Sequence, residues 1–249
     1  MAAAAVHEDR PVAIVAGGST GIGASVARRL NKEGYLVVVV SSKSVDEGES
    51  VAAELDGGWF LQADLGEPGA AAEVVARVES EHGRLDTVVY AAGKTVRIAH
   101  PDIHDVTDDI WDGILKLNLL GPWHFVQAAE RLLRKSPNGN IVVVGALAGV
   151  DVGGSSIPYA VSKAALHHMC KLLGGALGPE IRINAVAPGF IETRWTEDWA
   201  AFRSQISETA PLRRTGLPEE VAELVLGLIR STYVTGQTVV IDGGLSLLP

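Results

Sequence analysis

The sequence has few of the residues that disulfide-bonded, metal-thiolate or membrane proteins need. Cys170 is the only cysteine among 249 residues, so it can form no intrachain disulfide and belongs to no set of thiolate ligands. No apolar run approaches the roughly 20 residues that span a bilayer. Charged residues follow Met1 to Ala5 almost at once, without the apolar stretch of a signal peptide. We expect a cytoplasmic protein with no membrane partner, and a flexible tail over residues 1–10.

Positive charge is also scarce. The chain has 21 Lys and Arg against 30 Asp and Glu, a formal net charge of −9, and the cations do not cluster. This distribution disfavours nucleic acid as a partner. Hydrophobic residues make up 47% of the chain and charged residues 20%, as in a globular protein, and no linker divides it. We expect one domain over residues 11–249.

Short apolar runs alternate with helical patterns along most of the chain. The runs predict strands at residues 12–16, 37–40, 59–62, 86–91, 141–144, 181–186 and 238–241. The helical patterns lie at residues 22–30, 45–55, 67–81, 107–134, 158–177 and 218–230, with a break expected near Gly121 and Pro122. The alternation predicts an α/β doubly wound Rossmann fold, in which helices cover both faces of a parallel sheet. Residues 188–217 interrupt it and are expected to form a substrate lid.

A glycine-rich segment, Gly17 to Gly23, follows the first predicted strand. Glycines at this place permit a tight turn and a close approach of the backbone to a ligand, and the free amides at the start of the next helix attract a pyrophosphate. Such glycines also occur in plain turns. Their position in the first strand-to-helix turn of a doubly wound pattern favours dinucleotide binding.

Tyr159 and Lys163 lie four residues apart in a predicted helix and therefore share one face. A neighbouring ammonium group favours the phenolate, so Lys163 is expected to lower the pKa of Tyr159 toward the range in which a phenol exchanges protons. Pairs of this kind are common in helices, so the pair identifies a site only in combination with other motifs.

In combination, these motifs resemble those of the short-chain dehydrogenase/reductase family over residues 11–245. Ala16 replaces the Thr that begins the family's glycine motif, and further matches are Asp64-Leu65, Asn118, Pro188-Gly189 with Thr193, and Asp242-Gly243-Gly244. The resemblance implies seven strands in the order 3-2-1-4-5-6-7 and hydride transfer between a nicotinamide and a carbonyl or alcohol carbon of a small organic substrate. It also favours a homo-oligomer, a tetramer or a dimer, formed through the helices at residues 107–134 and 158–177.

The resemblance also implies roles for individual residues. Tyr159 would protonate the substrate oxygen, Lys163 would lower its pKa and bind the nicotinamide ribose, and Asn118 would hold a water that links Lys163 to solvent. The implied cofactor contacts are Gly17, Ser19, Thr20, Gly21, Ile22, Gly23, Ser41, Ser42, Lys43, Asp64, Leu65, Ala91, Ala92, Gly93, Tyr159, Lys163, Pro188, Gly189, Ile191 and Thr193.

The end of the second predicted strand favours NADP over NAD. NAD-binding folds place an acid there to hold the ribose 2′-hydroxyl, whereas a 2′-phosphate needs hydrogen-bond donors and positive charge. This chain has Ser41, Ser42 and Lys43 at that place, and Thr20 in the glycine loop adds a donor. NAD is the less favoured alternative.

The family's usual catalytic serine, 13 residues before the tyrosine, corresponds to Ala146. Losing one such donor typically costs about 2.7–4 kcal/mol of transition-state stabilisation. Ser155 or Ser156 could substitute, although a Ser before Pro158 also suits a helix N-cap. Alternatively the substrate supplies its own hydrogen bond, the reaction reduces an imine or an activated alkene, or the protein is a nucleotide-binding sensor with little turnover.

Aromatic residues mark the predicted lid. Trp195, Trp199 and Phe202 have helical spacing and are expected to form one stripe that covers an apolar or planar substrate, or that packs on a neighbouring helix or subunit. Arg194 beside them could meet an anionic substrate, although a solvated side chain is the simpler expectation.

Two further local patterns are given less weight. His100 and His104 lie near two aspartates, but Pro101 interrupts the helix that metal binding at this spacing would need, so no metal is expected. Tyr90-Ala91-Ala92-Gly93 replaces the family's Asn-Asn-Ala-Gly, which we interpret as a change in packing.

Overall fold

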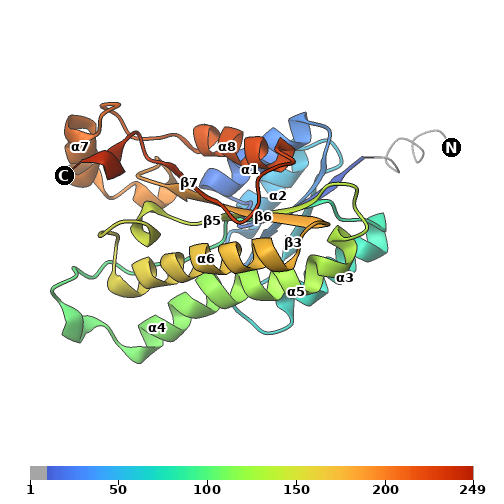
Figure 1. Cartoon of the computed structure of the whole chain (residues 1–249), viewed down its shortest axis with the longest axis horizontal. Helices are drawn as coiled ribbons and strands as arrows, with labels where there is room; N and C mark the ends of the chain where they lie inside the picture. The colour runs from blue at the N-terminus through green and yellow to red at the C-terminus, as the bar shows by residue number, and fades with distance from the viewer. Residues whose placement is uncertain (1–9, 249) are drawn as a thin grey trace.

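The computed structural model describes residues 10–248, which contain a seven-stranded parallel sheet (Figure 1). The strands are β1 (Val12–Ala16), β2 (Leu36–Ser41), β3 (Trp59–Gln62), β4 (Thr87–Tyr90), β5 (Gly139–Val144), β6 (Ile181–Pro188) and β7 (Thr238–Ile241). Their order in the sheet is β3-β2-β1-β4-β5-β6-β7, and each neighbouring pair is parallel. The predicted fold class and strand order are therefore confirmed.

The sheet is buried on both faces. Successive side chains of a strand point to opposite sides, so Ile14 and Val38 belong to the core on one face, while Val15 and Val39 belong to the core on the other. This explains why the strands read as continuous apolar runs instead of alternating ones.

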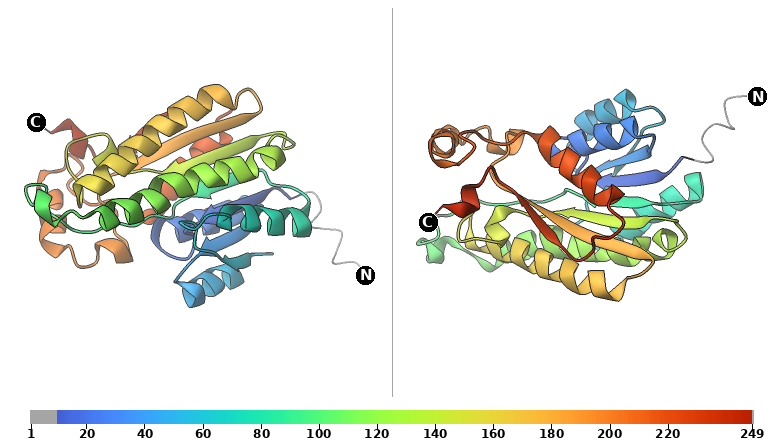
Figure 2. Two further views of the ribbon diagram at one scale, coloured as in Figure 1. Left: turned by 90° about the horizontal axis from the view of Figure 1, so that it is seen from below. Right: turned by 45° about the horizontal axis from the view of Figure 1, so that its top comes forward.

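Helices form a layer on each side of the sheet. α1 (Gly21–Lys32), α2 (Val45–Glu54) and α8 (Pro218–Arg230) cover one face, and α3 (Ala70–His82), α5 (Gly121–Leu133) and α6 (Ile157–Ala176) cover the other. Figure 2 shows α3, α5 and α6 side by side from below. The loops that link strands to helices open at the carboxyl edge of the sheet, where ligands of doubly wound folds bind.

The long helix expected at residues 107–134 is not broken at Gly121 and Pro122. It consists of α4 (Asp108–Leu115), a π-helical turn (Lys116–Leu120) and α5. In the wider turn the Gly121 amide donates to the carbonyl of Lys116, five residues back. Pro122 has no amide hydrogen for the next such bond, and the Tyr90 hydroxyl bonds the Leu117 carbonyl at 2.9 Å instead. The π-helical turn thus accommodates the proline.

The predicted lid, residues 188–217, lies beyond the carboxyl end of β6. It contains a short 3₁₀ helix, Arg194–Thr196, and α7 (Ala200–Thr209), which Figure 1 shows at the same end of the molecule as the C-terminus. A bridge between Ile191 and Gly216 joins its two ends.

Most of the predicted N-terminal tail, residues 1–9, lies outside the described residues. Its last member, Arg10, is part of the fold: its guanidinium donates to the carbonyls of Gly34 and Tyr35 and pairs with Asp56 at 2.9 Å. Including residue 10 in the tail was therefore wrong. Within residues 10–248, no helix is both long and apolar enough to cross a membrane.

Candidate active site

A cavity of about 1390 Å³ opens at the carboxyl edge of the sheet. Its walls come from the loops after β1, β2, β4, β5 and β6 and from the first turns of α6. It therefore collects residues that are far apart in the sequence but share one edge of a parallel sheet. Every predicted cofactor contact except Asp64 lines it.

The glycine loop is shaped so that only glycines fit. Gly17 and Gly21 have φ of +76° and +53°, and a Cβ on Gly17 would lie 2.6 Å from the Ala92 nitrogen. A Cβ on Gly23 would lie 2.0 Å from the Gly17 carbonyl oxygen. The loop leads directly into α1, whose first amides have no partner within the helix. These residues fit the pyrophosphate of a dinucleotide.

The loop after β2 forms the next part of the wall. Ser41, Ser42 and Lys43 all line the cavity, but the Ser41 hydroxyl already donates to the Ser44 carbonyl at 3.0 Å. Ser42 and Lys43 therefore remain as donors for a ligand. Asp64 does not reach the cavity because its carboxylate accepts from the Gly66 amide in its own turn, while its neighbour Leu65 does line it.

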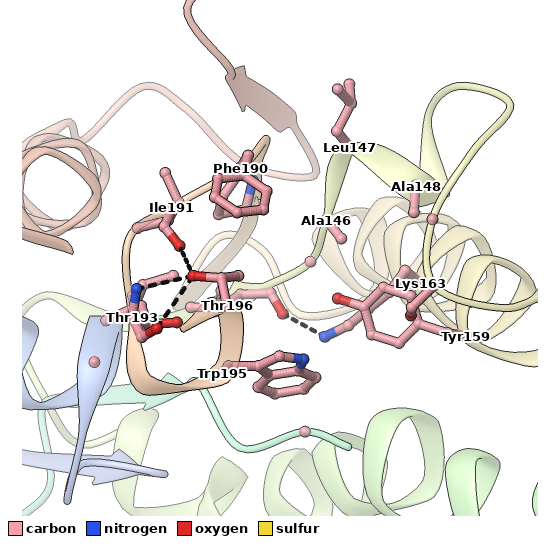
Figure 3. A pocket seen from close by; sticks show the side chains of 18 of the residues that line it. Ala146, Leu147, Ala148, Tyr159, Lys163, Phe190, Ile191, Thr193, Trp195 and Thr196 are labelled. Carbon is pink, nitrogen blue, oxygen red and sulfur yellow. Dashed lines mark hydrogen bonds between the residues drawn. The ribbon is translucent and has the colours of Figure 1, made fainter. Parts of the chain in front are cut away.

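Tyr159 and Lys163 project into the cavity from the first turns of α6. Lys163 Nζ donates to the Val144 carbonyl at 2.8 Å and lies 5.8 Å from the centre of the Tyr159 ring. The Trp195 ring lies against the tyrosine from the lid side, with 6.3 Å between ring centres. Figure 3 shows the Ala146 methyl beside this group. The geometry brings the predicted phenol and ammonium together beneath an aromatic cover.

The pKa of Tyr159 is shifted in the opposite direction to the prediction. Burial raises it to about 12, because a phenolate loses its hydration there. Lys163 does not reverse this shift, since its ammonium is directed at the Val144 carbonyl and burial lowers its own pKa to about 8. At neutral pH the site thus holds a protonated phenol and a charged lysine, which suits the donation of a proton by Tyr159.

Asn118 lies in the π-helical turn and is fully buried. Its Oδ1 accepts from the Lys94 amide at 2.9 Å, and its Nδ2 donates to the Lys94 carbonyl and the Ser162 hydroxyl, each at 3.0 Å. The side chain thus ties the segment after β4 to α6 and does not line the cavity. Its polar atoms are already engaged in protein bonds, so the predicted water cannot be assigned to a free side-chain group.

Ala146 lines the cavity close to Tyr159 and is only 8% exposed. Of the two candidate replacements for a hydroxyl, Ser156 is fully buried as the N-cap of α6, where it accepts from the Tyr159 amide. It does not line the cavity, so its assignment to the substrate site was wrong. Ser155 does line it, with its hydroxyl bonded to that of Thr95.

A buried histidine lies behind Ala146 that no sequence pattern predicted. His167 follows Lys163 by one helical turn, and a Cβ on Gly145 would lie 1.9 Å from its Nε2. Within the described residues, neither of its nitrogens has a hydrogen-bond partner of good geometry, and the ring lies close to the backbone of Gly149. Burial lowers its pKa to about 4, so the ring stays neutral at physiological pH.

The aromatic residues of the lid do not form one stripe, because α7 begins only at Ala200. Trp195 lies over Tyr159, whereas Trp199 and Phe202 pack on Phe190, with ring centres 6.2 and 5.5 Å away. The predicted single stripe is therefore wrong. Trp199 does line the cavity, and its contact with a substrate stays a prediction.

Much of the cavity wall comes from positions that no sequence motif marked. They share only a place on loops, on α7 or near the C-terminus: Arg97, Ile98, Ala99, Leu147, Ala148, Val152, Phe190, Gln205, Ile206, Thr209, Leu245 and Leu248. His100 and Arg194 also line the cavity. Arg194 forms an ion pair there with Glu47 at 2.6 Å.

Known proteins resemble this chain over nearly its whole length. A family model described as enoyl-(acyl carrier protein) reductase matches residues 16–246. A protein assigned as ketoacyl reductase 2 of the granaticin polyketide synthase from Streptomyces violaceoruber is 47% identical over 243 residues, which cover 96% of this chain and 98% of that protein. The 3-oxoacyl-(acyl-carrier-protein) reductase FabG from Thermotoga maritima is 35% identical over 252 residues, which cover 94% of this chain and 97% of that protein.

A solved structure extends the likeness to three dimensions. The RhlG/NADP active-site complex from Pseudomonas aeruginosa matches with a TM-score of 0.85 at 29% identity, over 94% of this chain and 95% of that one. The chain belongs to the short-chain dehydrogenase/reductase family of oxidoreductases, which use NAD or NADP.

Proposed function

We propose that this protein is an NADP(H)-dependent ketoreductase of a small organic substrate, with Tyr159 as its acid and base. The observation that carries the proposal is the position of Tyr159 beside Lys163, with Nζ 5.8 Å from the centre of the phenol ring, in the cavity that also contains the glycine loop. A phenol held in its neutral form can donate a proton to an oxygen that gains negative charge.

The chain's own groups position the substrate and supply the proton. A carbonyl oxygen at the Tyr159 hydroxyl accepts its hydrogen bond and then its proton, while the Trp195 ring covers that side of the site. The charge on Lys163 stabilises the phenolate that remains. When bound, the cofactor supplies the hydride. Because Ala146 has no donor, Tyr159 has to orient the oxygen as well as protonate it.

The loop after β2 supports NADP as the cofactor. Ser42 and the exposed Lys43 line the cavity, and Thr20 begins α1 without a capping bond from its side chain. These groups offer hydroxyl donors and positive charge for a 2′-phosphate. The similar Pseudomonas structure is a complex with NADP, which agrees with this choice.

The names of the relatives suggest the substrate. Two of them are reductases of ketoacyl or 3-oxoacyl groups, so we propose a ketone in a β-ketoacyl or related polyketide compound. One observation favours an alternative: the missing donor at Ala146, together with the family description as an enoyl reductase, is compatible with reduction of an activated alkene. Imine reduction and a weakly active nucleotide sensor are compatible with the same missing donor.

The active form is proposed to be a homo-oligomer, a dimer or a tetramer, without nucleic acid or membrane. Large apolar side chains are exposed on the helices that cover one face of the sheet: Trp123 on α5, and Val161 and Leu172 on α6. Contact between copies would bury them.

Oxidation of NADPH during incubation with ketones, β-ketoacyl thioesters, quinones, enones and imines tests the proposed reaction. We expect turnover of ketones or ketoacyl thioesters, and a loss of turnover but not of NADPH binding in Tyr159→Phe. Tight NADPH binding without turnover of any compound would favour the sensor, and turnover of enones alone would favour the alkene reductase.

A further inference from the structure

The part of the cavity beyond Tyr159 contains a cationic side chain without an acidic partner. Four Lys and Arg side chains line the cavity: Lys43, Arg97, Lys163 and Arg194. Arg194 pairs with Glu47, and Lys163 donates to the Val144 carbonyl. Within residues 10–248, Arg97 makes no hydrogen bond or ion pair. Arg97 is therefore a cation of the cavity wall without an acidic partner, although acidic residues outnumber basic ones in the chain and its net charge is −9.

Arg97 is nevertheless held in place. Its guanidinium lies 4.7 Å from the centre of the Trp199 ring, and Trp199 is itself packed against Phe190 and Phe202. The Ile98 amide next to it donates to the Ser155 carbonyl at 2.9 Å. Stacking fixes the plane of a guanidinium and leaves the N–H groups at its edge available to a ligand.

A second polar group lies three residues farther along the same segment. His100 lines the cavity, and its Nε2 is buried without a hydrogen-bond partner among the described residues. A buried polar atom of this kind is costly unless a ligand satisfies it. The acidic side chain of the facing wall, Asp151, accepts from the Val152 amide.

We infer that Arg97, with His100 on the same segment, binds an oxyanion of the substrate, a carboxylate or a phosphate, while Trp195 and the cluster of Phe190, Trp199 and Phe202 contact its apolar or planar body. The inference rests on the proposed reductase function and names the substrate class of that site. A planar guanidinium with free edges matches the two oxygens of such a group.

Matched substrate pairs test this assignment. The first pair is a naphthyl γ-keto acid and its methyl ester; the second is acetoacetyl-coenzyme A and acetoacetyl-N-acetylcysteamine. We expect the wild type to have a KM about tenfold lower for the anionic member of at least one pair. Arg97→Gln should remove that preference while the kcat and KM of the neutral member stay within about twofold. A preference in the first pair identifies a carboxylate, and one in the second identifies a phosphate.

Arg77→Gln is the matched control, because Arg77 stacks on Trp59 with 5.5 Å between guanidinium carbon and ring centre, away from the cavity. It should leave both pairs unchanged. His100→Phe should weaken the anionic preference about threefold, since it removes one hydrogen-bonding group and leaves the guanidinium of Arg97 in place. The inference is overturned if Arg97→Gln changes neither pair, if it affects both members equally, or if Arg194→Gln alone removes the preference.

A readout without turnover separates this inference from the proposed function. Binding of naphthylbutanoate and of its amide, followed by quenching of tryptophan fluorescence in the presence of NADPH, requires no reduction. If no ketone is reduced but the acid binds about tenfold more tightly than the amide, and Arg97→Gln cancels the difference, the reductase proposal fails and the anion site stands. Equal binding of acid and amide refutes a carboxylate site, and equal KM values within the acetoacetyl pair as well refute the anion site altogether.

Discussion

The two halves of the cavity are built from different kinds of chain. The proposed cofactor half, residues 17–23, 41–44 and 91–93, consists of short turns fixed directly to the ends of β1, β2 and β4. The proposed substrate half, residues 97–100, 145–155 and 188–209, consists of longer segments held by side-chain contacts such as Arg97 on Trp199. The short turns of the first half leave little room for changes in sequence or length. The longer segments of the second half can differ in conformation without disturbing the sheet. The proposed proton donor, Tyr159, lies where they meet.

The largest expected effect is at this junction. Tyr159→Phe removes the proton donor and keeps the ring that packs against Trp195. Turnover should fall about 100- to 10,000-fold, the usual contribution of a general acid, while the affinity for NADPH changes less than threefold. Steady-state kinetics and a fluorescence titration with NADPH measure the two quantities. An active Tyr159→Phe variant would assign the proton transfer to another group.

A charge reversal probes the cofactor half alone. Lys43→Glu should weaken NADPH binding about tenfold to 100-fold, because a charge-assisted hydrogen bond is lost and a repulsive carboxylate is introduced. Binding of NADH should change little. Lys135→Glu, which makes the same change in net charge outside the cavity, is the control. Titrations of each variant with NADPH and with NADH measure the two affinities. An equal loss of affinity for both nucleotides would contradict the assignment of Lys43 to the 2′-phosphate.

Adding a hydroxyl probes the substrate half. Ala146→Ser places a donor beside Tyr159, and turnover of a simple ketone should rise about tenfold, part of what one preorganised donor can contribute. The KM for NADPH should stay the same. Comparison of kcat for cyclohexanone or a similar ketone tests this, and an unchanged kcat would show that the substrate or another group already supplies the hydrogen bond.

The smallest expected effect is a pH dependence at the boundary of the two halves. Burial lowers the pKa of Lys163 to about 8, so its charge is present below that pH and is lost above it. Tyr159, with a pKa near 12, remains protonated throughout. We expect kcat/KM for reduction to fall about fourfold between pH 7 and 8.5. The Lys163→Arg variant should be slower but should lack this fall in kcat/KM, because a guanidinium stays charged over this pH range. If the wild type and the variant show the same pH profile, the fall belongs to another group.

The cofactor half was predictable from sequence because its determinants are local. The glycines of residues 17–23 are required by positive φ and by close backbone contacts, and both requirements belong to a single turn. Asp64 was the exception, since only the folded turn shows its carboxylate bonded to Gly66.

The substrate half was less predictable because its contacts join distant segments. Helical spacing suggested that Trp195 and Trp199 act together, but the helix begins after both and they face different partners. Ser156 was correctly identified as a candidate N-cap, yet burial at that position also removed it from the substrate site. Nothing local indicated that Arg97 would lie on Trp199, or that Gly145 would leave room for the ring of His167.

The π-helical turn links the sheet to α6, the helix that carries Tyr159. Pro122 leaves the Leu117 carbonyl to the hydroxyl of Tyr90, on β4. The adjacent Asn118 bonds the Ser162 hydroxyl, which in turn donates to the Tyr159 carbonyl at 2.7 Å. A continuous line of hydrogen bonds and covalent links thus runs from the buried centre of the sheet to the backbone of Tyr159, the proposed proton donor. A displacement of β4 would therefore reach Tyr159 from behind, through Asn118 and Ser162, neither of which lines the cavity.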